Sequence, residues 1–414
     1  MNQNTTGAGN VAVGMRAKRY GTGHNYCTAV GYYALQGTNG YNASHNNTAV
    51  GYQALKVNTE GSNNVAVGMN ALQQNTSGYR NTAVGSGACD AITTGDDNTA
   101  VGNLALDALT TGNYQTAVGS YAMSSCTTAS SSTAVGYKAL FAQTTGSQNT
   151  AIGEGNLIAL TTGNYNVSVG GQALELLTTG SECTACGFQA GEDNTANHVT
   201  AVGYRALGNN TTGQSNTACG HQALENCSTG ENNTAIGQNA FAGVTTGSNN
   251  TALGKGAGGV GVGNVQTSSN NMCLGDNNVT DSFIKVDWTV GSDRRDKTDI
   301  EPFTHGLSWV NKLNPVTYRW DNRSNYEDGK PDGSKKSPKL NVGLIAQDEL
   351  EVEKEHGFGD TPDNMIIAHV DDGGGYGMKY AKLVPILINA VKELSTKNDE
   401  LAAEIASLKS QINN

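Results

Sequence analysis

A serine and a lysine in the C-terminal part carry the clearest chemistry in this chain. Ser292 and Lys297 lie five residues apart in a charged run from Gly291 to Ile300. A serine hydroxyl acts as a nucleophile when a neutral lysine amine accepts its proton, and burial or a neighbouring cation favours the neutral amine. Taken alone, such a pair is typical of a solvated loop. Because five residues do not place two side chains on one helix face, only a turn would join them.

Four further motifs follow this run, and their order is informative. They are Leu313–Trp320, Val342–Asp348, Met378–Leu387 and Ala390–Leu394. Together with the charged run, these motifs resemble the C-terminal intramolecular chaperone domain of phage tail fibres and tailspikes, a self-cleaving peptidase of the endosialidase type. The resemblance covers about residues 290 to 412.

This resemblance implies a role for each residue of the pair. Ser292 would be the nucleophile, Lys297 its general base, and the bond between Gly291 and Ser292 the one that is broken. Such a serine peptidase acts once on its own chain, so we expect no turnover activity and no cofactor. A lysine that becomes competent only when a trimer closes around it would couple cleavage to correct assembly.

The preceding part of the chain repeats itself every seventeen residues around Thr-Ala-Val-Gly. Twelve of the fifteen intervals between the recurring glycines are 17 residues, one is 16, and those of 20 and 21 lie near the two ends. The glycines are Gly14, Gly31, Gly51, Gly68, Gly85, Gly102, Gly119, Gly136, Gly153, Gly170, Gly187, Gly203, Gly220, Gly237, Gly254 and Gly275. So constant a period indicates one structural unit stacked on itself.

Each repeat is typical of one flattened coil of a parallel β-solenoid. Thr-Ala-Val favours a short strand, and the glycine after it favours a tight corner. Alanine three residues later, usually followed by leucine, predicts a second strand, and a second glycine in many copies predicts the return turn. We expect Ala, Val, Ile and Leu to line a thin interior, which favours oligomerisation.

The repeats resemble the head of trimeric autotransporter adhesins, in which Ala-Val-Gly-like motifs build a left-handed β-roll in a three-fold bundle. This resemblance covers about residues 11 to 275 and implies a trimeric, elongated, surface-exposed rod. The fold class expected is mainly β: a parallel, left-handed β-roll solenoid of about sixteen 17-residue coils, trimeric. An α+β chaperone domain ending in a coiled-coil helix would follow it.

The charge balance excludes several partners. The net charge is −11, and residues 1–291 carry nine basic against fifteen acidic side chains. Therefore neither residues 1–291 nor the remaining residues offer a basic surface for nucleic acid or anionic membranes. No apolar stretch reaches 18 residues, and the first thirty residues lack the apolar core of a secretory signal, so we expect synthesis in the host cytoplasm and no membrane insertion.

Cysteine and histidine give no sign of a metal site. Cys186 and Cys219 occupy the valine position of the repeat and Cys273 its alanine position, so we interpret them as small buried apolar residues. Cys183 and Cys186 form a Cys-x-x-Cys motif without a second pair at zinc spacing. The seven histidines are scattered without ligand spacing, and we expect no metal.

The chain ends in a predicted helix with a heptad seam. Its members alternate spacings of four and three: Leu387, Val391, Leu394, Asn398, Leu401, Ile405, Leu408 and Ile412. An amide at a core position of a coiled coil costs stability but sets register and oligomer state, which is the role we predict for Asn398. The alternative is an amphipathic helix that packs on its own domain. We favour a trimeric coiled coil.

These observations predict the organisation of the chain. We expect a lead-in over 1–10, the β-roll over 11–275, a junction with the cleavage site over 276–291, and the chaperone domain over 292–414 with its coiled coil over 383–412.

The function that explains both parts is a homotrimeric phage tail fibre located in the virion tail. It would bind a bacterial surface polysaccharide or protein receptor and other tail proteins, and remove its chaperone by self-cleavage. Receptor contacts are expected at the irregular ends, Gly31 to Gly51 and Gly254 to Gly275, and at Trp288. The alternatives are a bacterial or prophage-encoded trimeric surface adhesin and a polysaccharide-degrading tailspike.

Overall fold

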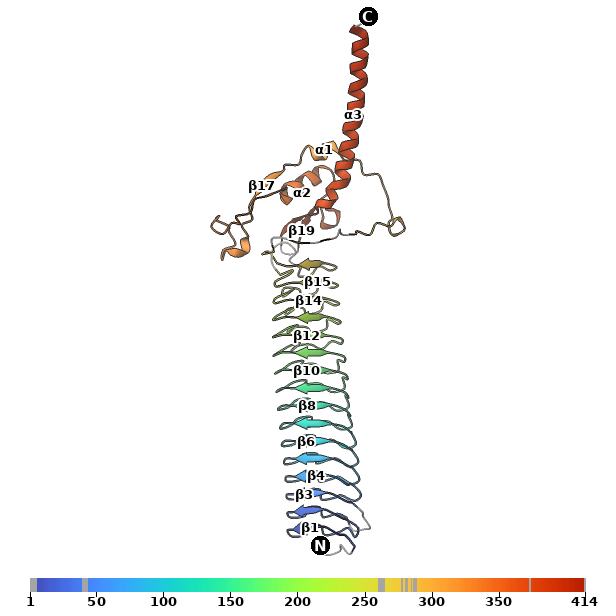
Figure 1. Cartoon of the computed structure of the whole chain (residues 1–414), viewed down its shortest axis with the longest axis vertical. Helices are drawn as coiled ribbons and strands as arrows, with labels where there is room; N and C mark the ends of the chain where they lie inside the picture. Colours follow the sequence, from blue (N-terminus) through green and yellow to red (C-terminus); the bar gives the residue numbers. More distant parts are fainter. Residues whose placement is uncertain are drawn as a thin grey trace. The chain divides into compact units, whose positions relative to one another are not determined.

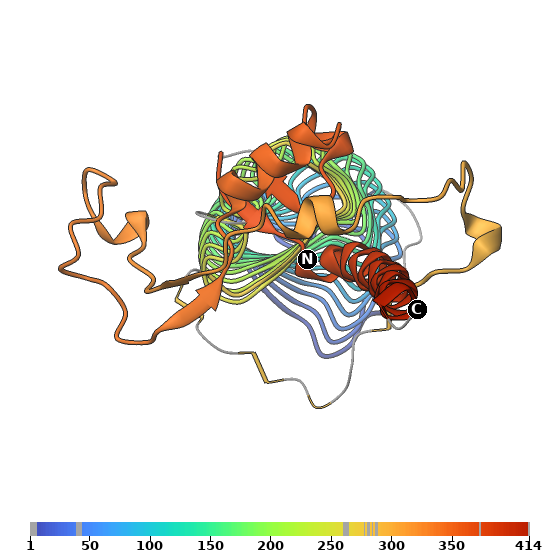
Figure 2. The same ribbon diagram turned by 90° about the horizontal axis from the view of Figure 1, so that it is seen from above.

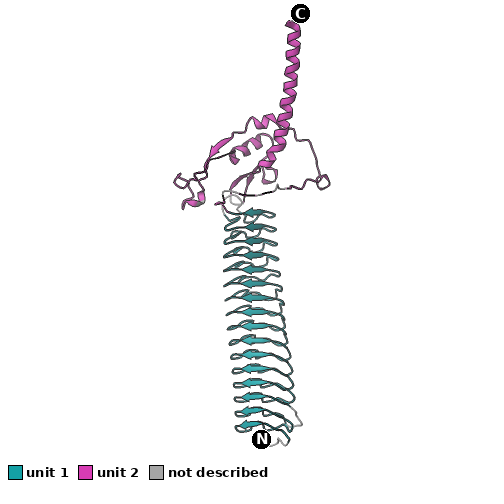
Figure 3. Cartoon of the chain, viewed as in Figure 1, with its two compact units in different colours: residues 1–259, 265–275 teal, residues 260–264, 276–414 magenta. Residues whose placement is uncertain are grey.

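The computed structural model describes residues 6–38, 44–259, 265–276, 278–279, 282–283, 285, 289–371 and 374–412. The chain divides into two compact units (Figure 3). Unit 1 comprises residues 1–259 and 265–275, and unit 2 comprises residues 260–264 and 276–414.

Unit 1 is built on one parallel sheet of sixteen strands, each paired with its neighbours in sequence (Figure 1). The strands are β1 (Val11–Val13), β2 (Thr28–Val30), β3 (Thr48–Val50), β4 (Val65–Val67), β5 (Thr82–Val84), β6 (Thr99–Val101), β7 (Thr116–Val118), β8 (Thr133–Val135), β9 (Thr150–Ile152), β10 (Val167–Val169), β11 (Thr184–Cys186), β12 (Thr200–Val202), β13 (Thr217–Cys219), β14 (Thr234–Ile236), β15 (Thr251–Leu253) and β16 (Met272–Leu274). The register pairs equivalent residues, such as Ala83 with Ala100, so each position of the repeat forms a column. The predicted parallel β-solenoid is confirmed, and its successive coils follow one another with a small offset (Figure 2).

The corner glycine after each strand is required by two features of the backbone. Gly85 has a φ of +143°, which side-chain-bearing residues rarely adopt. A Cβ atom at Gly85 would also lie 2.2 Å from the carbonyl oxygen of Gly102 in the next coil. Any other residue would therefore push the two coils apart.

The second strand predicted in each coil is not formed. At Ala54, for example, the flanking residues Gln53 and Leu55 have φ values of 56° and 51°, in the left-handed region. An extended strand would send neighbouring side chains to opposite faces, whereas this turn buries both Ala54 and Leu55 in the core. Burial of a leucine contributes about 1.5–3 kcal/mol, which offsets the roughly 1–2 kcal/mol cost of a left-handed residue. The coils remain hydrogen-bonded here, since Leu55 N donates to Ala71 O at 2.9 Å.

Some side chains of the strands face solvent, although we expected them to face the core. Only the central residue of each strand, which is alanine in all strands except β10 and β16, points inward, because side chains alternate along a strand. The valine position points outward, so the prediction that strand valines line the interior is wrong. Cys186 and Cys219 are exposed for the same reason, which corrects their interpretation as buried residues. Cys273 is half-buried because β16 ends the sheet and has a neighbouring strand on one side alone.

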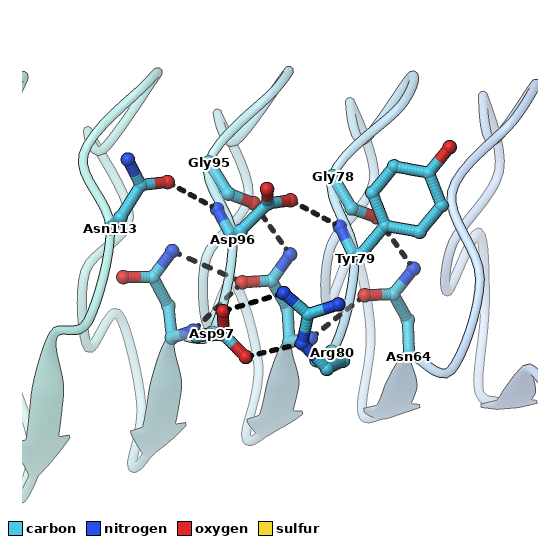
Figure 4. A network of polar contacts seen from close by, with 10 residues as sticks. Asn64, Gly78, Tyr79, Arg80, Gly95, Asp96, Asp97 and Asn113 are labelled. Carbon is cyan, nitrogen blue, oxygen red and sulfur yellow. Dashed lines mark hydrogen bonds and ion pairs between the residues drawn. The ribbon is translucent and has the colours of Figure 1, made fainter.

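A column of buried asparagines, which sequence reasoning missed, joins the coils from inside. In most coils the residue before the strand is an asparagine, such as Asn64, which donates from Nδ2 to the carbonyl oxygen of Gly78 at 2.8 Å. Its Oδ1 accepts from the backbone N of Asn81 in the next coil at 2.9 Å, and Asn81 repeats the pattern with Gly95 (Figure 4). Replacing Asn81 by alanine would remove the partners of two buried backbone groups, Gly95 O and Asn98 N, at a cost of about 1–3 kcal/mol each.

Unit 2 combines helices with two small antiparallel sheets. Its elements are η1 (Arg294–Asp296), α1 (Leu307–Val310), β17 (Val316–Tyr318), η2 (Arg323–Asn325), β18 (Asn341–Gly343), α2 (Ala346–Glu355), η3 (Pro362–Asn364), β19 (Ala368–Val370), β20 (Tyr376–Met378), η4 (Tyr380–Lys382) and α3 (Leu383–Ile412). β17 pairs with β18, and β19 pairs with β20. The buried core gathers Trp309, Ile367 and Ile386. No helix in the described residues has the length and apolar content of a transmembrane span.

Candidate functional site

Ser292 and Lys297 lie at the two ends of a single 3₁₀ turn, η1. Asp293 caps this turn, because its carboxylate accepts a hydrogen bond from the backbone N of Arg295 at 2.9 Å. The Arg295 guanidinium pairs with the same carboxylate at 2.6 Å and holds the pKa of Asp293 below its usual range. Lys297 N then donates to Arg294 O at 3.3 Å, which closes the turn. The turn that a five-residue separation requires is thus present.

The turn brings the two side chains of the pair together. Lys297 Nζ lies 2.5 Å from Ser292 Oγ and donates a hydrogen bond to it. For catalysis the direction must reverse: a neutral amine accepts the hydroxyl proton while Oγ attacks the carbonyl carbon of Gly291. Both side chains are exposed in a single chain, and a Cβ atom at Gly291 would meet no atom within 4 Å. A single chain therefore holds the pair in contact but leaves it open to water.

Two buried glutamates of α2 organise the rest of the domain, and sequence reasoning did not identify them. Trp309 donates from Nε1 to Glu349 Oε1 at 2.8 Å, and burial raises the pKa of Glu349. Glu353 accepts from three consecutive backbone N–H groups, at 2.8, 2.7 and 2.5 Å. Those N–H groups belong to Ile366, Ile367 and Ala368. The four-residue spacing of the two glutamates, which places them on one helix face, was the available signal.

The structure also brings separate sequence motifs into contact. The Tyr380 hydroxyl accepts a hydrogen bond from Leu344 N at 3.0 Å, joining the motif at Val342 to the motif at Met378. A Cβ atom at Gly343 would lie 2.6 Å from that hydroxyl oxygen, so glycine leaves room for the tyrosine.

A family model covers this part of the chain, from Ser292 to Phe358. It is the chaperone of endosialidase. The match begins at Ser292 itself and includes η1, α1, β17, β18 and α2. No curated protein and no solved structure matches the chain. A parallel β-solenoid with such a chaperone domain fits a tail-fibre-like protein.

The long helix α3 has one face packed against other parts of unit 2. Ile386 and Ala390 are buried, and Asn389 Nδ2 donates to the carbonyl oxygen of Phe303 at 2.6 Å. Glu393 accepts from Leu307 N, at the start of α1, at 3.0 Å. These contacts come from a face other than the heptad seam.

The heptad seam itself is open to solvent in a single chain. The exposed fractions of its apolar side chains range from 47% for Leu387 to 81% for Ile412. Asn398 lies on this exposed seam as well. The packing of α3 within unit 2 therefore does not account for the heptad pattern.

Some of the other residues named in the sequence analysis can also be located in the structure. His305 and His356 lie with ring centroids 5.1 Å apart around Trp309, in an aromatic cluster. Within the described ranges, no three His, Cys, Asp or Glu side chains gather closely enough to hold a metal ion. Trp288 and the additional residues of the irregular end coils, 39–43 and 260–264, lie outside the described residues.

Proposed function

We propose that this chain is a homotrimeric phage tail fibre whose C-terminal domain directs assembly and then removes itself by cleavage between Gly291 and Ser292. The observation that carries the proposal is the chaperone match beginning at Ser292, next to a lysine amine 2.5 Å from its hydroxyl. The exposed pair lacks the enclosure that a neutral amine needs, and neighbouring chains of a trimer would supply it. Cleavage would then occur only in correctly assembled trimers.

A second observation supports association of the rods. The third residue of each strand forms an exposed apolar column along the sheet, with Val84, Val101 and Val118 each 36–38% exposed. Ile152, Ile236 and Leu253 continue it at 42–45%. Long exposed apolar surfaces are uncommon on single soluble chains and mark interfaces. We assign this column to contacts between the three copies of the chain.

Charged residues in this column are expected to prevent trimer formation. In the rod released by self-cleavage, which lacks the C-terminal helix, V101D and V118D together would place six carboxylates in one three-fold interface. Light scattering of the released double variant should then give the mass of one rod, whereas the parent rod gives three. Y114D is the matched control, because Tyr114 is 63% exposed and lies outside the column. If the double variant remains trimeric, the column is not part of the interface.

The mature rod is expected to bind susceptible cells without degrading their surface. Each site on a repeated, three-fold rod can be weak, because multivalency raises avidity by roughly 10²–10⁴. Fluorescently labelled protein should decorate susceptible bacteria, and purified surface polysaccharide should release no reducing ends during incubation. Steady release of oligosaccharides would instead assign the chain to the depolymerising tailspikes.

A further inference from the structure

The residue after each corner glycine forms a column of its own, and aromatic rings occupy several positions of it. Phe188, Tyr204 and His221 stack on one another, with centroid separations of 6.1 and 5.1 Å and nearly parallel planes. Tyr137 is another ring of this column, and it contacts Tyr121, which lies outside the column, edge to face at 6.4 Å. Between Tyr137 and Phe188 the column carries Glu154 and Gly171 in place of rings.

Two glycines open a groove between Tyr137 and Phe188. Gly155 and Gly171 contribute no side chains there, and the resulting groove has a volume of about 400 Å³. Tyr137 and Phe188 line it, each close to half exposed. The Phe188 ring leans over Gly171, since a Cβ atom at Gly171 would lie 3.3 Å from Cδ2 of the ring. The groove is therefore walled by rings and has room for one or two sugar rings.

Polar side chains of both signs line the same groove. Lys138 Nζ lies 5.3 Å from the centroid of the Tyr137 ring. Glu154, Gln172 and Glu175 supply carboxylate and amide groups, and the Gln172 amide hydrogen-bonds the Glu175 carboxylate. Ligand sites combine apolar walls with a few polar groups that orient the ligand. The walls suit the apolar face of a sugar ring, and the polar groups suit its hydroxyls.

We propose that this groove binds a short neutral saccharide segment of a bacterial surface polysaccharide. The proposal deepens the receptor-binding role above and rests on it. Two carboxylates against one ammonium would repel an acidic sugar, which is why the ligand is a neutral one. Three copies of the groove on a trimer would act together, so each contact can be weak.

Binding of full-length protein to an array of bacterial surface oligosaccharides, neutral and acidic, tests this proposal. Labelled wild type should bind neutral members and not acidic ones. Phe188→Ala should lower binding about tenfold, as for removal of one aromatic anchor. Gly155→Gln should fill the groove with a similar loss, because Gln172 and Gln189 adopt the same φ of 55° in equivalent positions. Tyr52→Ala is the matched control, since Tyr52 holds the equivalent position elsewhere and is 47% exposed.

The outcomes separate the groove from the receptor-binding role. If wild type decorates susceptible cells but Phe188→Ala and Gly155→Gln bind as strongly, the groove is not the site and the fibre function stands. Binding of acidic oligosaccharides alone, or of none on the array, would also overturn the groove assignment. If wild type decorates no cells, the receptor-binding role itself fails.

Discussion

Full-length protein is expected to separate into fragments of 291 and 123 residues once it has assembled. Ser292→Ala removes the nucleophile and Lys297→Arg replaces the base by a guanidinium that stays protonated. Each should slow cleavage by about 10⁴-fold or more, the scale seen when an essential nucleophile or base is removed. Denaturing gels of boiled samples report the fragments, and unboiled samples report the trimer.

The matched control for this experiment is Thr298→Ala. Thr298 lies next to Lys297 and its hydroxyl bonds to Asp299 at 2.8 Å, outside the Ser292–Lys297 contact. This variant should cleave as wild type does, while both site variants remain full-length trimers. Cleavage of Ser292→Ala at the same bond would refute the nucleophile, and a stable wild-type trimer that never cleaves would refute the peptidase role while leaving a chaperone role intact.

Loss of the chaperone domain before folding is expected to leave the rod insoluble. All strand pairing in the solenoid sheet is parallel and joins successive coils. In the proposed trimer, three chains would have to start in register before their stacks grow. A gene ending at Gly291 should therefore give at least about tenfold less soluble trimer than the full gene. Size-exclusion chromatography of the soluble fraction measures this yield.

Comparing two rods of identical sequence separates an effect on folding from an effect on stability. Rod released by self-cleavage of wild type ends at the same residue as rod made from the truncated gene. It should persist as a trimer, because its coils are already in register. Abundant soluble trimer from the truncated gene would show that the rod needs no chaperone to assemble.

Much of the fold was predictable because the repeat is strictly local. The 17-residue period, the Thr-Ala-Val strands and the corner glycines depend on neighbouring residues and on stacking of identical units. The same holds for the Ser292–Lys297 turn, since Asp293 is a strong capping residue and the contact spans one turn. The heptad spacing likewise predicts the seam of α3, whose apolar side chains are exposed.

The sequence by itself determined the period, the parallel stacking, the boundary near Gly275 in the repeat pattern, and the residues of the candidate dyad. The tertiary structure decided which way the side chains face. A three-residue strand can send either one or two side chains inward, and the curvature of the closed coil selects the central alanine. The same closure forces Leu55 and its equivalents into left-handed conformations and aligns Asn64 with Asn81. These outcomes depend on contacts between coils about seventeen residues apart, and no local propensity contains that information.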